Sequence, residues 1–504
     1  MIASSLLICL LCCSFLLNSL SVSSASAFLE GMFTTPAAMI TGDLYIQWGD
    51  QAPEDGAASL ALFQLHDPTS DRFYTLKFGS KLPLPYEELV RYRGLPVQVS
   101  GWHANNLQSE DGADQFQVAA IQPLKNAPQF KTASTTLAVT GEKPFVSLMC
   151  KFSDISSEPQ NLAYFQNMYA AAYPGLDHYW RQASGGLMNI AGSSAYGWYT
   201  LPSPRSAYIA NNRLDFLKIA SDCTALADPH VDFRTVHGIN LMFNGNLDGY
   251  AWGGGLWMTL DGVARFWPMT WEPPWGYQHV TAIAHEMGHA FGLPHSSGMY
   301  GLTYDNRWDV MSDTWTDCVN LMDAVYGCLG QGTIGYHLDR LGWIPANRLV
   351  NLSPGTNGTF NLVRLHQPPE SGLMLLKVNV PGVSTRYFTV EVRRKAGYDQ
   401  KLPREGVVIH EVVTTRERPA QVVDADNNGN TGDEGAVWSQ GETFVDQTSG
   451  ISIKMTGISG GVYTVEVAYP AAGSPTPTRP PTTALTPTLM VIYSNRSFLP
   501  AIQK

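Results

Sequence analysis

The sequence predicts a multidomain α+β protein in which a central mixed α/β domain is flanked by an N-terminal β-barrel-like domain and a C-terminal β-sandwich. Its 504 residues are 44% hydrophobic and 15% charged, which is enough apolar material for several buried cores. Short segments with strand alternation fill both flanks of the chain. In the middle, segments with helical spacing alternate with apolar strands, the pattern of a mixed α/β domain.

Residues 1–27 have the pattern of a signal peptide. An apolar run from Leu6 to Leu17 is followed by small residues that end in Ala25-Ser26-Ala27, and we expect cleavage after Ala27. The run is shorter than the roughly 20 apolar residues that a membrane-spanning helix needs. Its start lacks Lys and Arg, so a retained membrane anchor stays open as the alternative. We therefore expect a secreted, extracellular protein.

Three domains are expected after this leader. An N-terminal β-domain over residues 28–135 resembles an OB-type barrel in its layout, and it could be a binding module, a prosegment or a spacer. A central domain is expected over residues 141–350 and a C-terminal β-sandwich over residues 355–470. The segments behind these predictions are strands at 44–48, 73–78, 97–101 and 116–118, helices near 161–172 and 214–225 with a strand at 239–243, and strands at 373–380, 387–392, 407–409 and 462–467.

Two segments follow the last domain. Residues 471–488 are rich in Pro and Thr, which predicts an extended, semi-rigid linker. Residues 489–504 form a short apolar tail that Ser494, Asn495 and Arg496 interrupt, so it is too short to span a bilayer. We expect either a tail that associates with a membrane or cell surface, or simply a frayed terminus.

Charge and cysteine content narrow the class of protein. The formal net charge of -11 argues against a nucleic-acid partner, because no basic stripe is present to contact phosphates. Three of the seven cysteines lie in the leader, and an even number of four remains, which predicts two disulfides with three possible pairings. We favour Cys318 with Cys328, which closes a short loop, and Cys150 with Cys223, which closes a long one. Buried free thiols are the alternative.

The most informative segment is TAIAHEMGHAFGLPH, which has the pattern H-E-x-x-H-x-x-G-x-x-H. On a helix, His285 and His289 lie one turn apart on one face and can direct two imidazoles at one metal ion. Gly292 and Pro294 end that helix, so the chain can turn and bring His295 to the same ion. Three protein ligands leave a fourth position for water, which is typical of a catalytic zinc site.

Glu286 lies next to the first histidine but off the ligand axis, where its carboxylate can reach that water. We expect it to act as a general base, taking the proton of the water that attacks a peptide carbonyl and passing it to the leaving amine. Zinc would lower the pKa of the water from about 15.7 to about 7. A chance pattern on a buried helix is the weaker interpretation, because few chains with 12 histidines match all these spacings.

Downstream of the predicted zinc helix, the segment Trp308-Asp309-Val310-Met311-Ser312 resembles the metzincin superfamily, in which a turn carrying a methionine lies beneath the three histidines. Met311 is the candidate, with ordinary core packing as the alternative. The resemblance extends from about Gly141 to Tyr469 and is closest to secreted peptidases of the gametolysin and immune inhibitor A kind. It implies a zincin catalytic domain and a zinc-dependent peptidase. The other segments that carry it are 197–202, 341–344, 392–394 and 397–399.

Three features of the sequence can be compared with subgroups of the metzincins. Immune inhibitor A-like enzymes commonly have Asp where this chain has His295, so the histidine moves it toward the gametolysin side. Some metzincins add a tyrosine ligand two residues after the methionine, but this position is Asp313, and we expect no tyrosine ligand. Others are kept latent by a prosegment cysteine on zinc, yet residues 28–149 contain no Cys. Any latency must therefore use another device.

The aromatic and Gly-rich segment 250–260 precedes the predicted zinc helix. In zincins an edge strand at this place pairs with the extended substrate backbone, so the segment is a candidate wall of the substrate cleft. Plain core packing is the alternative.

A second metal site is a hypothesis for the acidic segment that starts at Asp424. It begins like the calcium loop of an EF-hand, but its twelfth position is Gly435 instead of Glu, so the EF-hand itself fails. A looser Ca²⁺ site would use Asp424, Asp426, Asn428 and Asp433. A solvated acidic turn is the alternative.

Together these patterns predict a secreted zinc metalloendopeptidase that hydrolyses internal bonds of extracellular proteins or peptides. Zn²⁺ would bind His285, His289 and His295, with Glu286 as the general base. One alternative is a non-catalytic cell-surface adhesin or glycan-binding protein that keeps a relic zinc site, and the complete set of ligands argues against it. The other is a zinc hydrolase acting on a non-peptide amide, which no sequence feature favours.

Overall fold

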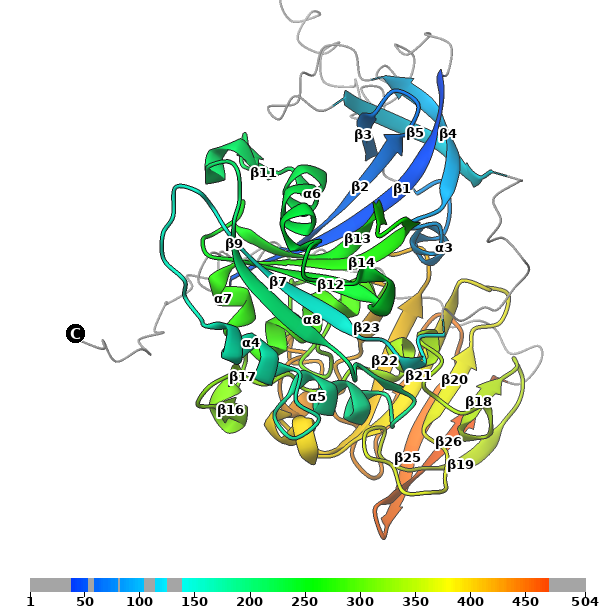
Figure 1. The fold of residues 1–504 in the computed structure, drawn as a ribbon. Helices are drawn as coiled ribbons and strands as arrows, with labels where there is room; N and C mark the ends of the chain where they lie inside the picture. The colour runs from blue at the N-terminus through cyan, green and yellow to red at the C-terminus, as the bar shows by residue number, and fades with distance from the viewer. Residues whose placement is uncertain (1–37, 53–58, 80–81, 104–113, 125–137, 471–504) are drawn as a thin grey trace, which may run out of the picture.

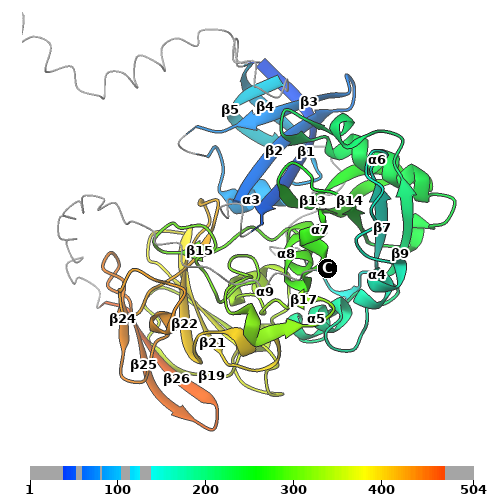
Figure 2. The same ribbon diagram turned by 90° about the vertical axis from the view of Figure 1, so that its left-hand side faces the viewer.

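The computed structural model describes residues 38–52, 59–79, 82–103, 114–124 and 138–470 (Figure 1). The predicted signal peptide, Pro/Thr-rich linker and C-terminal tail lie outside these residues. The protein is multidomain and rich in β-sheet, with a barrel at one end, a mixed central domain, and a pair of sheets at the other end (Figures 1 and 2).

The N-terminal domain is a closed five-stranded barrel, which confirms the barrel-like domain expected there. Its strands pair in the order β1-β2-β3-β5-β4-β1. Alternate side chains of β1, among them Leu44, Ile46 and Trp48, point into a core that the other strands and one helix complete. The elements are β1 (Ala38–Gln51), β2 (Ser59–Asp67), β3 (Arg72–Lys77), α3 (Tyr86–Arg91), β4 (Pro96–His103) and β5 (Asp114–Pro123).

The central sheet continues directly from the barrel. Strand β1 also pairs with β13, and the order β1-β13-β14-β12-β7-β9 makes one ten-stranded sheet through both domains. Neighbours among β14, β12, β7 and β9 run parallel, whereas β13 is antiparallel to both β14 and β1. The bounds are β7 (Phe145–Lys151), β9 (Ser194–Thr200), β12 (Gly238–Phe243), β13 (Tyr250–Leu260) and β14 (Val263–Glu272).

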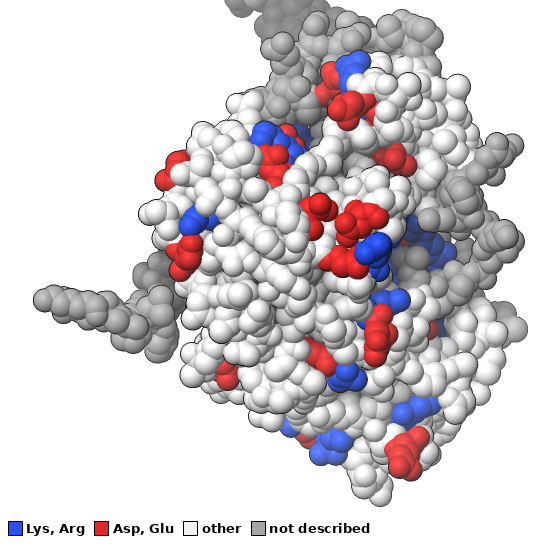
Figure 3. Space-filling model, viewed as in Figure 1, with Lys and Arg blue, Asp and Glu red and all other residues white. Residues whose placement is uncertain are grey.

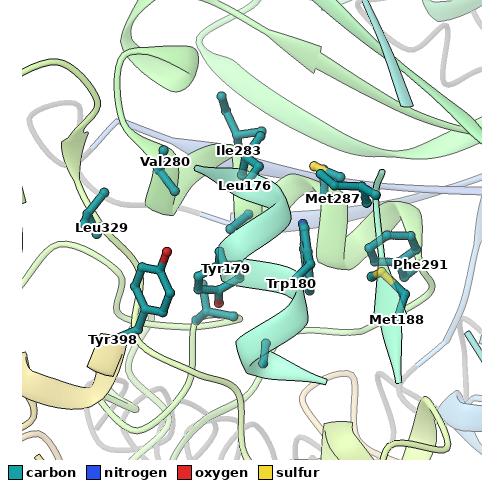
Figure 4. Packing of buried hydrophobic residues seen from close by; sticks show 14 of the residues in the cluster. Leu176, Tyr179, Trp180, Met188, Val280, Ile283, Met287, Phe291, Leu329 and Tyr398 are labelled. Atoms are coloured by element: carbon teal, nitrogen blue, oxygen red, sulfur yellow. The ribbon is translucent and has the colours of Figure 1, made fainter. Parts of the chain in front are cut away.

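Helices cover the two faces of this sheet. Side chains of β7 and β12 alternate between two hydrophobic cores, one shared with α5 and α8 and the other with α6. Figure 4 shows the first core, where Trp180 of α5 meets Phe291 at the end of α8 with ring centroids 5.1 Å apart. The helices are α4 (Leu162–Met168), α5 (Leu176–Ala183), α6 (Phe216–Ala227), α7 (Pro274–Tyr277), α8 (Val280–Ala290) and α9 (Gly335–Arg340).

Side-chain caps explain where two of these helices begin. Asn161 accepts a hydrogen bond from the Tyr164 backbone N–H, and Asp215 accepts one from the Lys218 backbone N–H. Short elements connect the larger ones in the central domain: β6 (Gly141–Glu142), β8 (Met188–Asn189), η2 (Arg205–Ala207), β10 (Ile209–Ala210), β11 (Arg213–Leu214), η3 (Phe233–Thr235), η4 (Cys318–Leu321), β16 (Met322–Asp323), β17 (Gly327–Cys328) and η5 (Ala346–Arg348).

The C-terminal part contains a six-stranded sheet, β15-β23-β22-β21-β20-β18, and a four-stranded sheet, β19-β26-β25-β24. Buried side chains of both sheets form one core, the arrangement of a β-sandwich. Strand β15 follows the predicted zinc ligands, so it ties the central domain to this sheet. The bounds are β15 (Ser297–Gly298), β18 (Leu349–Leu352), β19 (Gly358–Leu362), β20 (Leu375–Asn379), β21 (Arg386–Arg393), η6 (Gly397–Lys401), β22 (Gly406–Val413), β23 (Ala420–Val422), η7 (Glu434–Ala436), β24 (Thr443–Val445), β25 (Ser452–Ser459) and β26 (Val462–Ala468).

Both favoured disulfides form. Cys150 of β7 bonds to Cys223 of α6 across 73 residues, and Cys318 bonds to Cys328 across 10 residues. Within the described residues, no helix is long and apolar enough to cross a membrane. On the face shown in Figure 3, described Lys and Arg side chains lie singly or beside Asp and Glu.

Candidate metal centre

Helix α8 carries the first two predicted ligands and lies directly against β13. The helix is buried along its whole length, and His289 has no exposed surface. Gly253 of β13 explains how the two can approach so closely. A Cβ at Gly253 would collide with the Glu286 carbonyl oxygen and would lie 2.6 Å from the Cβ of His289. The absence of a side chain at Gly253 is therefore what lets α8 pack so closely on β13.

The three predicted histidines converge as expected. The Nε2 atoms of His285 and His289 lie 3.0 Å apart, and those of His289 and His295 lie 3.1 Å apart. Gly292 has φ of +93°, in the left-handed region, which ends α8 and turns the chain back so that His295 reaches the other two. The turn predicted from Gly292 and Pro294 is thus present.

Backbone carbonyls fix how two of these rings are protonated. Nδ1 of His285 donates to the Val310 carbonyl at 2.6 Å, and Nδ1 of His289 donates to the Leu293 carbonyl at 2.7 Å. Since a carbonyl only accepts, each Nδ1 must carry a proton, so Nε2 is the atom that presents a lone pair when the ring is neutral. Two facing lone pairs at 3.0 Å repel each other unless a cation lies between them. The donor set therefore fits a metal ion.

A fourth side chain, Asp50, reaches the same point and was not predicted. One carboxylate oxygen lies 2.7 Å from Nε2 of His295, and the other lies 3.2 Å from Nε2 of His285 and 3.4 Å from Nε2 of His289. Among the described residues, Asp50 and the three histidines are the one group of at least three His, Cys, Asp or Glu whose ligand atoms all lie within 4.8 Å. The structure thus brings together a buried group of one Asp and three His that could hold a metal ion.

The spacing of these four donors suits a small tetrahedral ion. A tetrahedron with metal–nitrogen distances of about 2.05 Å has edges of about 3.3 Å. Five distances between neighbouring ligand atoms, two between histidines and three in which Asp50 uses either carboxylate oxygen, are 2.7–3.4 Å, close to that edge length. The imidazole and carboxylate donors are those that zinc accepts, but several first-row metals share them.

No local pattern marks Asp50 in the sequence. It lies 245 residues before His295, at the end of β1. What brings it to the histidines is the pairing of β1 with β13, in which Asp50 lies opposite Ala251. Only a prediction of this long-range strand pairing could have found it.

The electrostatics of the four groups are mutually dependent. Burial alone would raise the pKa of Asp50, but His295 and His285 outweigh it and hold that pKa well below its usual value. Burial lowers the pKa of His289 far below its usual value and lowers that of His295. For His285, burial is outweighed by Asp50, and the pKa is raised.

Glu286 lies beside the cluster without a fixed partner. It is 1% exposed, and its Oε2 accepts no hydrogen bond in the described structure. Burial, followed by repulsion from Asp50 and Glu272, raises its pKa well above the usual value. Burial likewise raises the pKa of Glu272 to about 8. A dication on the histidines would counter this effect for Glu286, because its charge is the largest nearby.

Met311, the methionine predicted to lie beneath the histidines, packs against α8. It is fully buried, and a Cβ at Gly288 would collide with its Sδ, so the methionine packs directly on the turn of α8 between the two histidines. The Ser296 backbone N–H donates to the Met311 carbonyl at 3.2 Å, which ties this segment to the residue after His295.

A buried carboxylate organises this floor of the site. Asp309 accepts hydrogen bonds from Ser296 Oγ and Thr333 Oγ1, both at 2.6 Å, and lies 3.0 Å from Nδ1 of His337. Burial would raise its pKa, but His337 and these hydrogen bonds outweigh it and lower the pKa. Arg393 of β21 donates to the Trp308 carbonyl, so the C-terminal sheet supports the same turn.

The acidic segment considered for calcium is only partly assembled. The Asn428 side-chain amide donates to Asp426 at 3.1 Å and to Asp433 at 2.9 Å. Asp424 instead accepts from the Tyr300 hydroxyl at 2.7 Å, and its Oδ1 is buried without a hydrogen-bond partner in the described structure. A Ca²⁺ site here stays a prediction.

Comparisons with known proteins leave the assignment to these geometric arguments. A scan against protein-family models finds no match to the chain, and a search of curated proteins also finds none.

Proposed function

We propose that this protein is a secreted zinc metalloendopeptidase of the metzincin type. The observation that carries the proposal is the convergence of three buried histidine Nε2 atoms beside Glu286, a carboxylate with one oxygen free of hydrogen bonds. The methionine beneath α8 and the ended helix at Gly292 support the metzincin assignment. Two disulfides support an oxidising compartment.

In this proposal His285, His289 and His295 hold Zn²⁺, which supplies Lewis acidity toward water and a peptide carbonyl. Glu286 accepts a proton from the attacking water and returns it to the amine of the leaving peptide. The carbonyls of Val310 and Leu293 keep two imidazoles in the required tautomer. No covalent enzyme intermediate is needed.

The expected substrate is an extended segment of an extracellular protein or peptide. Strand β13 lies directly against α8 and is antiparallel to the strand beside it. At residues 250–253 its outer edge is paired with β1, and an extended peptide that replaced β1 there would form the same backbone hydrogen bonds and pass the metal centre, the mode known as β-augmentation. Such binding depends on the backbone hydrogen bonds of an extended peptide, so it suits a peptidase better than a hydrolase of small amides.

One observation favours a second candidate, a non-catalytic adhesin or glycan-binding protein with a relic zinc site. Asp50 supplies a fourth protein donor, and closed four-donor sets are typical of structural zinc. The two functions differ in whether a form with an open fourth position cuts peptide bonds.

The test is internal cleavage of casein by the chain without residues 1–27, made as the wild type and as Asp50→Ala, each with a Glu286→Gln partner. We expect cleavage at internal peptide bonds of casein. A chelator should abolish this cleavage. Glu286→Gln should also abolish it, without loss of bound zinc. If all four proteins bind one zinc and none cuts, the peptidase proposal is wrong and the relic-site candidate is favoured.

A further inference from the structure

We propose that the N-terminal barrel is a built-in inhibitor of the metal centre, with Asp50 as the fourth metal ligand and the end of β1 occupying the substrate edge of β13. This inference rests on the proposed function, because it describes how the same site is regulated. Four independent features of the described residues support it.

The first feature is strand occupancy. Trp48, Gly49, Asp50 and Gln51 pair antiparallel with residues 250–253 of β13. This is the part of β13 that faces α8, and it is the edge at which an extended substrate would add. A peptide cannot form these backbone hydrogen bonds while β1 holds them.

The second feature is the position of the Asp50 carboxylate. Its oxygens lie 2.7–3.4 Å from the three Nε2 atoms, and the side chain is 10% exposed. The Tyr304 hydroxyl donates to Oδ1 at 2.5 Å and so holds the carboxylate in this orientation. A carboxylate here takes the fourth coordination position that a reacting water needs.

The third feature is that two further side chains of the barrel contact α8. The Trp48 indole stacks on the His289 ring, with centroids 5.1 Å apart and planes 9° apart. The Arg93 guanidinium donates to the His289 carbonyl at 2.6 Å and to the Ala290 carbonyl at 2.9 Å. A cation at the last carbonyls of a helix is favourable, so Arg93 caps the C-terminal end of α8.

The fourth feature is the fit between the two strands. A Cβ at Gly49 would lie 2.6 Å from the ring of Trp252 on β13, so only glycine allows this close approach. Gly253 on the opposite strand has the same property toward α8. The neighbouring strands β1 and β13 and the helix α8 are therefore closely fitted to one another, as expected for a specific inhibitory contact and not for a loose spacer.

Residues 28–149 contain no Cys that could keep the enzyme latent, and Asp50 together with the end of β1 would take that role. In the described arrangement, residues 48–51 block both the fourth coordination position, where a reacting water would bind, and the edge of β13, where a substrate would pair. Displacing that segment frees both at once, so a single event would convert a closed centre into an open one.

The test measures access to the metal without relying on catalysis. All proteins carry Glu286→Gln to prevent self-digestion, are loaded with Co²⁺, and are titrated with acetohydroxamate, which binds an open coordination position and changes the visible spectrum of Co²⁺. The variants are Asp50→Ala, which removes the ligand, and Gly49→Val, which pushes β1 from β13 and leaves Asp50 intact. The matched control is Asp43→Ala, in the same strand but outside the cluster.

We expect both site variants to bind acetohydroxamate at least tenfold more tightly than the parent, and Asp43→Ala to behave like the parent. The Co²⁺ spectrum without the probe should also change in Asp50→Ala but not in Asp43→Ala. Circular dichroism and melting temperature identify any variant that fails to fold, in which case the other site variant decides. Equal affinity in all folded proteins would overturn the inhibitor proposal.

The outcomes separate this inference from the proposed function. If the parent site is already open to the probe and the wild type cuts casein at full rate, the inhibitor is wrong and the peptidase stands. If Asp50→Ala opens the site but no form cuts, the closed ligand set stands and the peptidase is wrong. If Co²⁺ and Zn²⁺ do not bind the histidines at all, both proposals are overturned.

Discussion

Gly253→Ala tests whether the close packing of α8 on β13 sets the geometry of the metal centre. The added methyl would lie 2.6 Å from the Cβ of His289 and still closer to the Glu286 carbonyl oxygen, and ordinary van der Waals contact begins at 3.4 Å, so the strand and helix must separate by at least about 0.8 Å. The Glu286 carbonyl is buried backbone and the His289 Cβ is bonded directly to the backbone, so neither atom can rotate away. Overpacking of this kind typically costs about 2 kcal/mol in the free energy of unfolding.

That cost should lower the melting temperature of the central domain by about 4–8 °C. The metal should be affected more strongly, because ligand positions are tolerated only within about 0.2 Å. We expect the affinity for Zn²⁺ to fall at least tenfold, the size of effect seen when the support of a ligand is removed. Calorimetry with and without zinc, together with competition against a chromogenic chelator, measures both quantities.

Gly457→Ala is the matched control. Gly457 also lies in a strand, β25, but its added Cβ would meet nothing closer than 3.9 Å. Alanine at a compatible position reduces the entropy of the unfolded chain, so this variant should be neutral or slightly more stable. The reasoning is refuted if Gly253→Ala melts within about 1 °C of the wild type and binds zinc with unchanged affinity.

Four further outcomes are expected. Arg93→Met should lower the free energy of unfolding by about 2 kcal/mol, measured by urea denaturation, because two carbonyls at the end of α8 lose a charged donor. Asp309→Asn should cost about 3 kcal/mol and reduce bound zinc, measured by melting and metal analysis, because it breaks a buried charged network. For Asp446, burial would raise the pKa, but hydrogen bonds from Arg386 lower it to about 2. Because this folded pKa lies below the unfolded value, the ionised carboxylate stabilises the fold above about pH 4. After allowance for solvent screening, the free energy of unfolding should decrease by roughly 1 kcal/mol as the pH falls from about 4 to about 2. Asp446→Asn should not show this decrease. Calcium should raise the melting temperature of the wild type and not of Asp426→Ala, and no change in the wild type would contradict the calcium hypothesis.

The metal-binding helix could be predicted from sequence because its determinants are local. The spacing of His285 and His289 follows from the helical period, and Gly292 ends the helix within one turn. All of these lie in one short segment, so no knowledge of distant strands is needed. The structure brings the three predicted histidines together as that reasoning required.

The barrel and the disulfides were also accessible from sequence, for a related reason. Strand alternation at Leu44, Ile46 and Trp48 identifies an inward face whatever the partner strand is. Four cysteines permit only three pairings, and loop lengths favoured the observed one.

Asp50 could not be predicted, because its role depends on which edge of which sheet β1 joins. The pairing of β1 with β13 joins segments about 200 residues apart, and nothing in either segment specifies the other. The strand 250–260 was expected to be either a cleft wall or core. In the structure it contacts α8 on one side and is already paired with β1 at its edge.

Continuity of the ten-stranded sheet also bears on how an opened molecule would behave in solution. Once β1 leaves, the backbone N–H and C=O groups of residues 250–253 lie at an unprotected sheet edge. Such edges recruit any extended chain, including a second copy of the same protein, and are sites of aggregation. The opened form therefore faces a competition between substrate and self-association that depends on protein concentration. Dilute samples supplied with substrate should stay monodisperse, whereas concentrated samples without substrate should cluster through the same edge that would bind a peptide.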